Sequence, residues 1–110
     1  MEQIFNKLVR DKIPEKIEGN GEKAFTRILS DEEYKIELYK KLEEECGEVI
    51  NSKNSSETLE ELADVLEVLI SIAELEDFNL HDIEEKRKEK KLKRGGFSKK
   101  IYLEKTIGDE

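Results

Sequence analysis

A segment that is apolar on nearly every side constrains the fold of this chain most strongly. The segment TLEELADVLEVLISIAELED, residues 58–77, has the spacing of an α-helix. One broad face carries Leu59, Leu62, Ala63, Leu66, Leu69, Ile70 and Ala73, and the other side carries Val65, Val68, Ile72 and Leu75. A helix of this kind is normally buried. Because 110 residues form only one small core, we expect a single all-α domain over 1–110, a helical bundle whose core is completed by dimerisation.

Capping signals divide the rest of the chain into further helices. Ser30 followed by Glu33 forms a capping box, which predicts a helix from near Asp31 to about Asn51. Asn54 marks the start of the next helix, which we expect to reach about residue 77. A third is expected to begin near Asn79 and to end at the glycines 95 and 96.

The two ends of the chain give weaker signals. Asp11 is expected to cap a short first element that has Pro14 in its first turn. The Gly-Asn-Gly run at 19–21 should end this element, and residues 24–29 should be extended or irregular. The tail from residue 97 is weakly strand-like, and its last residues are expected to fray.

Charge narrows the classes of function. The net charge of -8 argues against simple electrostatic binding to nucleic acid or to an anionic membrane. No apolar run approaches the roughly 20 residues that span a bilayer, and the start lacks the order of a signal peptide, so a cytoplasmic location is expected. Residues 86–100 nevertheless hold nine bases and one acid. This run is either a solvated helix end or an anion site that complements an acidic centre.

The glutamates of KLEEECGEVI, residues 41–50, point in different directions. At about 100° per residue, Glu45 falls inside the apolar stripe of its helix, where a leucine would be expected. Glu48 lies just off the edge of this stripe and Glu44 lies further round. Glu43 is on the far side and is interpreted as solvated.

A second acidic pair lies in the neighbouring helix. Glu61 and Asp64 flank Val68 and are embedded in its second apolar face. Buried carboxylates need protonation, a basic partner or a metal, and clustered carboxylate oxygens suit hard cations such as Mg²⁺. The alternative is that the acids pair with Lys41, Arg94 or other bases, or lie at the rim of the bundle.

The order of these motifs resembles a known family. KLEEECGEVI, then twelve residues after Glu48, then ELADVLEVL, is similar to the E-x-x-E and E-x-x-D signature of the MazG-like nucleoside triphosphate pyrophosphohydrolases. NKLVRDKIPE near the start and KLKRGGFSKKIYL near the end resemble a phosphoribosyl-ATP pyrophosphohydrolase-like branch of that superfamily.

The resemblance implies an all-α, at least dimeric, Mg²⁺-dependent enzyme, with Mn²⁺ as a substitute ion. It would cleave a (deoxy)nucleoside triphosphate or related nucleotide to the monophosphate and pyrophosphate. The implied metal ligands are Glu45, Glu48, Glu61 and Asp64, the residues that handle water are Glu44 and Glu48, and those that contact substrate are Arg10, Lys12, Lys91 and Arg94.

Two alternatives remain open at this point. The first is phosphoribosyl-ATP hydrolysis in histidine biosynthesis, which the end motifs suggest. The second is a non-catalytic helical dimer, an interaction module in which the acids only decorate the surface. Neither nucleic acid nor a membrane is expected as a partner.

Overall fold

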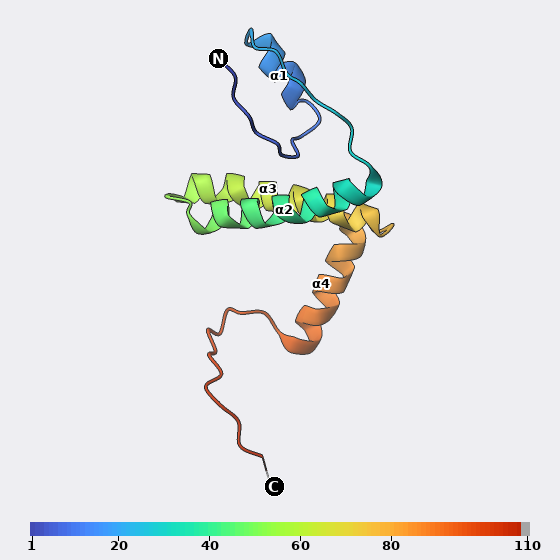
Figure 1. Cartoon of the computed structure of the whole chain (residues 1–110). Coiled ribbons are helices and arrows are strands. Elements are labelled where there is room, and N and C mark those ends of the chain that lie inside the picture. The colour runs from blue at the N-terminus through green and yellow to red at the C-terminus, as the bar shows by residue number, and fades with distance from the viewer. Residues whose placement is uncertain (109–110) are drawn as a thin grey trace. The chain divides into compact units, whose positions relative to one another are not determined.

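The structure is a computed structural model that describes residues 1–108, and in this part of the chain all regular structure is α-helical (Figure 1). The prediction of an all-α fold is therefore confirmed. Within residues 1–108, no helix is long and apolar enough to cross a membrane. The helices of this described part are α1 (Ile13–Gly19), α2 (Asp31–Ile50), α3 (Ser55–Leu75) and α4 (Leu80–Arg94).

The chain divides into two compact units, Met1–Phe78 and Asn79–Glu110, which are described separately. In the first unit, α2 and α3 lie side by side as a helical hairpin joined by residues 51–54 (Figure 1). Leu38 of α2 and Val68 of α3 are its buried apolar residues, with 3% and 8% of their surfaces exposed. This hairpin is the element that positions the candidate site. The second unit contains α4 and the tail.

The predicted helix starts are confirmed by their hydrogen bonds. Ser30 Oγ accepts a hydrogen bond from the Glu33 N–H, and the Glu33 carboxylate accepts one from the Ser30 N–H, both at 3.2 Å. Asn79 and Asp82 form the same reciprocal pattern at the start of α4. Arg27 also donates two hydrogen bonds to Glu33. The Arg27 hydrogen bonds, helped by those from Ser30, lower the pKa of Glu33 to about 2.

The prediction that Asp11 caps the first helix is wrong. The residue preceding α1 is Lys12, which has φ -95° and ψ 1°, and no side chain caps this end. A cap requires extended backbone directly before the helix, and Asp11 lies one residue too early. Pro14 does occupy the first turn, as predicted.

Two other boundaries differ from the predictions. The helix expected to reach residue 77 ends at Leu75, because Asp77 adopts φ 62° and Phe78 N–H bonds back to the Ala73 carbonyl at 2.9 Å. The tail from 97 to 108 is irregular and not strand-like, since a lone extended segment without a pairing strand forms no sheet. The predicted fraying concerns residues 109–110, which lie outside the described part.

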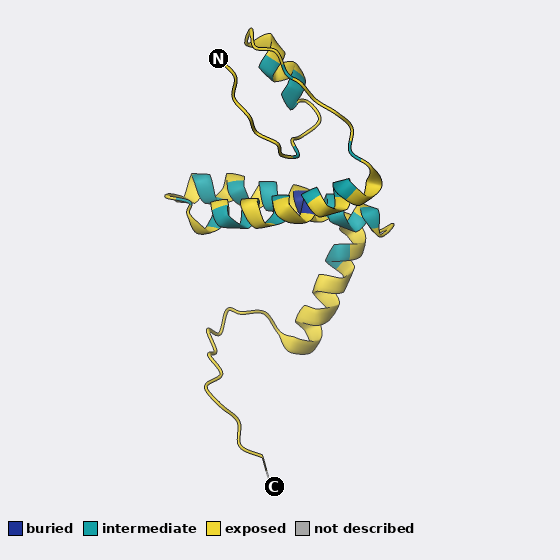
Figure 2. Cartoon of the chain, viewed as in Figure 1, coloured by how far each residue is buried: buried dark blue, intermediate teal, exposed yellow. Residues whose placement is uncertain are grey.

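The two apolar faces of α3 have different surroundings (Figure 2). Val68 is buried and its neighbours Val65, Ile72 and Leu75 are half-buried. The opposite face remains open within the chain, with exposed fractions between 70% and 37% for Leu59, Leu62, Leu66 and Leu69. The single chain thus leaves one apolar face of α3 uncovered, and dimerisation stays a prediction.

Leu38→Ala should destabilise the chain by about 3 kcal/mol, because truncating a buried leucine loses apolar burial and leaves a cavity. Ile36→Ala is the matched control on the same helix, since Ile36 is 57% exposed. Urea unfolding followed by circular dichroism measures both. Equal effects of the two substitutions would contradict this description of the core.

Candidate metal and active site

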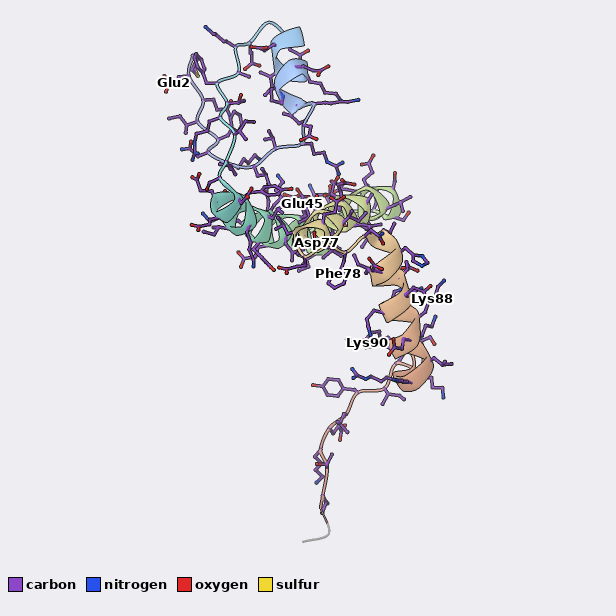
Figure 3. The ribbon with its side chains drawn as sticks, turned by 90° about the vertical axis from the view of Figure 1, so that its right-hand side faces the viewer. Glu2, Glu45, Asp77, Phe78, Lys88 and Lys90 are labelled. Atoms are coloured by element: carbon purple, nitrogen blue, oxygen red, sulfur yellow. The ribbon has the colours of Figure 1, made fainter. Side chains whose placement is uncertain are left out.

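The α2–α3 hairpin brings three carboxylates together. Glu45 of α2 and Glu61 and Asp64 of α3 each offer an oxygen, and these oxygens lie within 4.8 Å of one another. Glu61 and Asp64 share one face of α3 because they are three residues apart. All three residues are half-buried, and Figure 3 marks Glu45 on the hairpin. The acids that the sequence placed on apolar faces are therefore neighbours in space.

The other two predicted acids lie beside this carboxylate cluster of Glu45, Glu61 and Asp64. Glu48, one turn beyond Glu45 on α2, is exposed and not part of the cluster. Its negative charge nevertheless contributes to the raised pKa of Glu61. Glu44 is also exposed. Glu43 is exposed as well, as predicted.

Glu61 lies among other negative charges on the hairpin. Partial burial raises its pKa first, and the charges of Asp64, Glu48 and Glu45 raise it further. Within residues 1–108, no base forms an ion pair with Glu61. Its two partners are better compensated, because Asp64 contacts Arg10 at 2.7 Å and Glu45 contacts Lys41 at 3.6 Å.

Glu44 is held by two lysines. Lys41 Nζ lies 3.3 Å from one carboxylate oxygen and Lys7 Nζ lies 3.4 Å from the other. Desolvation by itself would raise the pKa of Glu44, but the two ammonium groups outweigh it and the pKa is lowered. Glu44 therefore stays ionised at neutral pH. An ion pair with Lys41 is what the sequence analysis gave as the alternative to metal binding.

The four predicted substrate contacts fall into two groups. Arg10 lies directly on the carboxylate cluster through Asp64, while Lys12 precedes α1. In the second unit, a groove at the end of α4 contains Lys91 and Arg94. Its full lining is Arg87, Lys90, Lys91, Arg94, Gly95, Gly96 and Phe97, and Lys90 and Lys88 are marked on α4 in Figure 3.

Sequence reasoning missed three features of this region. Lys7 does not stand out in the sequence, and its contact with Glu44 joins residues 37 positions apart. Phe97 adds an aromatic ring to the basic groove. The direct contact of Arg10 with Asp64 was also not predicted, although both residues had been singled out. The Arg-Asp-Lys run at 10–12 was the only local signal.

The residues of the cluster fit a divalent cation. They supply only carboxylate oxygens, which are the donors that Mg²⁺ and Mn²⁺ prefer. Partial burial, and after it the charges of neighbouring carboxylates, raise the pKa of Glu61, and a bound cation would offset the negative charge at this point. Glu45, Glu61 and Asp64 are the residues that would hold such an ion.

The family model for the MazG nucleotide pyrophosphohydrolase domain matches residues 34–96, which is more than half of the chain. The chain therefore belongs to this family, and it is a hydrolase that acts on the pyrophosphate bonds of nucleotides. Enzymes of the family generally depend on a divalent metal. A search of curated proteins and a search of solved structures each found no match. The matched segment includes the whole carboxylate cluster, whereas Lys7, Arg10 and Lys12 lie before it.

Glu61→Gln should stabilise the metal-free protein at neutral pH, because the folded state then holds one fewer of several mutually repelling carboxylates. A carboxyl group whose pKa is raised by folding favours the folded state below its ordinary value of 4.5, and this contribution is lost as the pH rises through the folded value. In the presence of chelator, the melting temperature of Glu61→Gln should therefore exceed that of the wild-type protein above about pH 6. At about pH 3 the two melting temperatures should be equal.

Glu60→Gln is the control for this experiment, since Glu60 is the neighbouring exposed residue on α3. This substitution also removes one negative charge from α3, but from a residue outside the cluster. A lower melting temperature of Glu61→Gln at neutral pH would contradict the description of Glu61 as uncompensated.

Proposed function

We propose that the chain is a Mg²⁺-dependent enzyme that cleaves a (deoxy)nucleoside triphosphate or a related nucleotide to the monophosphate and pyrophosphate. The observation that carries the proposal is the cluster of Glu45, Glu61 and Asp64, whose oxygens lie within 4.8 Å of one another inside the matched domain. The family supplies the reaction class. The cluster supplies the point at which a cation and a phosphate chain can meet.

Charge explains why a cation is needed at this site. A triphosphate brought to an acidic surface is repelled unless positive charge intervenes. When bound, a Mg²⁺ ion would supply positive charge to the phosphates and Lewis-acid polarisation of the phosphorus. Glu45, Glu61 and Asp64 would hold the ion, and we assign Glu48 as the fourth acid because its charge already acts on Glu61.

The two remaining roles on α2 concern the attacking water. A general base needs an accessible carboxylate within reach of the water proton. Glu48 is exposed and has no ion pair within residues 1–108, which favours it as the proton acceptor. Glu44 has a lowered pKa and two lysine partners, so we assign it to orienting the water rather than to taking its proton.

Four basic residues, two in each unit, are proposed to act on phosphate groups. Arg10 and Lys12 precede the matched domain, and Lys91 and Arg94 lie in the groove of α4. Guanidinium and ammonium groups bind phosphate oxygens strongly, and we assign these four residues to the substrate and to the leaving pyrophosphate. In this proposal the whole chain, 1–110, serves one activity.

We further propose a homodimer or higher homo-oligomer. The exposed leucines of α3 form an apolar face of the kind that a second copy covers. The partner is otherwise a nucleotide, with neither nucleic acid nor membrane, in keeping with the net charge of -8. A cytoplasmic location provides that substrate.

Phosphoribosyl-ATP hydrolysis is the second candidate, because the two end motifs resemble that branch and Arg10, from the first motif, contacts Asp64. Both candidates release pyrophosphate. Only the identity of the preferred nucleotide separates them, and the next experiment includes both.

Purified protein given Mg²⁺ and a panel of nucleoside triphosphates plus phosphoribosyl-ATP should release pyrophosphate from at least one member, and chelator should stop the release. Glu45→Gln or Asp64→Asn should reduce turnover by about 100-fold or more, because each removes a cation ligand. Helical content and assembly mass should be unchanged. Glu43→Gln, a solvated neighbour on α2, is the matched control.

The outcome that would refute the proposal is the absence of pyrophosphate across the whole panel. Orthophosphate release in place of pyrophosphate would refute the position of the cleaved bond. Full activity of Asp64→Asn would remove this residue from the site.

Leu66→Glu should separate the proposed assembly, because it places a charge in the middle of the exposed face of α3, where Leu66 is 42% exposed. Light scattering should give at least the dimer mass for the wild-type chain and a lower mass for this variant. Leu92→Glu is the control, since Leu92 is 90% exposed on α4. A monomeric wild-type chain would contradict the proposed dimer.

A further inference from the structure

We propose that Arg10 is an internal counter-ion that holds Asp64 in the metal-free enzyme and is displaced from it when the divalent cation binds. This inference rests on the proposed function, since it assumes that Asp64 is a cation ligand. It adds a role for a residue that lies before the matched domain. Arg10 would then couple cation binding to the availability of a guanidinium group for substrate.

The contact itself is short and direct. Arg10 Nη2 donates a hydrogen bond to Asp64 Oδ1 at 2.7 Å, between residues that are 54 positions apart. Asp64 is at the same time one of three carboxylates whose oxygens lie within 4.8 Å of one another. Arg10 therefore occupies a carboxylate that the cation needs. A charged group at this place competes with the ion both for the oxygen and through repulsion.

The pair is exchangeable. The side chains of Arg10 and Asp64 are 57% and 39% exposed, so water can replace either partner. The guanidinium uses one nitrogen on one oxygen, not the two parallel hydrogen bonds that make such pairs strongest. Exposed pairs of this kind contribute little to folding, and a divalent ion held by several carboxylates can outcompete one.

The surrounding charges explain why the metal-free protein needs a counter-ion at Asp64. Five carboxylates lie in or beside the cluster, and within residues 1–108 three basic side chains form ion pairs with them, so negative charge is in excess. The carboxylates are Glu44, Glu45, Glu48, Glu61 and Asp64, and the cations are Lys7, Arg10 and Lys41. Without Arg10 the excess would grow by one charge, and the metal-free hairpin would carry more repulsion.

The segment that carries Arg10 can release it without unfolding a helix. Residues 1–10 form neither helix nor strand, and nearly all of them are exposed. Lys7 of the same segment contacts Glu44 on α2. The segment can thus stay attached through Lys7 while Arg10 moves away from Asp64, which keeps the freed guanidinium near the site.

The inference predicts that one substitution at Arg10 strengthens Mg²⁺ binding and weakens nucleotide binding. Arg10→Gln should tighten Mg²⁺ binding to the substrate-free protein by about threefold to fivefold, because the competing ion pair is gone. The same variant should raise KM for the nucleotide, because a phosphate contact is lost. A residue that only bound substrate would change KM and leave Mg²⁺ affinity unaltered.

Isothermal titration of the metal-free full chain with Mg²⁺ tests the first effect. Lys16→Gln is the matched control, since it removes the same charge from exposed α1 and should leave Mg²⁺ affinity within about twofold. Unchanged or weaker Mg²⁺ binding by Arg10→Gln would overturn the inference while leaving the proposed function intact. If the wild-type chain bound no Mg²⁺ and released no pyrophosphate, both would fall.

A second measurement uses the unaltered protein. The chain has four arginines, so the side-chain Nε–H signals in a nitrogen-15 NMR spectrum can be assigned individually. Addition of Mg²⁺ should shift the Arg10 signal toward that of a free guanidinium and leave the Arg27 signal, which reports the Glu33 pair, in place. An Arg10 signal that does not respond at saturating Mg²⁺ would also overturn the inference.

Discussion

The packing of α2 against α3 is the interaction on which the rest of the structure depends. Leu38 and Val68 are the buried apolar residues of the hairpin, and the apolar contact between the two helices sets the register that places Glu45 beside Glu61 and Asp64. Partial burial raises the pKa of Glu61, and repulsion from Asp64, Glu48 and Glu45 raises it further. Apolar burial therefore holds together a group of charges that would otherwise separate. In the proposed function, a cation would offset this repulsion.

The distribution of positive charge follows from the same constraint. The irregular N-terminal segment supplies Lys7 and Arg10 to the hairpin, although it contributes little to the core. The bases of α4 belong to a separate unit, and four of them, Arg87, Lys90, Lys91 and Arg94, line a groove with Phe97. Negative charge is thus concentrated on a packed pair of helices, while much of the positive charge sits on segments with few packing contacts.

Local signals in the sequence predicted the main helices and singled out all three residues of the cluster. Ser30, Asn54 and Asn79 were recognisable as caps because capping depends on residues three positions apart. Glu45 was recognisable because it interrupts an apolar stripe. The contact between Arg10 and Asp64 could not be predicted, since it joins residues 54 positions apart and depends on the path of an irregular segment. The predictions of a cap at Asp11 and of a strand-like tail were wrong for a related reason. The structure of short elements depends on tertiary partners more than on their own residues.

The most direct test of the account is the location of the bound cation. Crystals of the full chain soaked in Mn²⁺ allow anomalous diffraction to place the ion without reference to activity. The account predicts one or more peaks in direct contact with carboxylate oxygens of Glu45, Glu61 and Asp64, with Arg10 withdrawn from Asp64. A fully occupied ion elsewhere on the chain, with these three carboxylates still free and Arg10 still on Asp64, would contradict it.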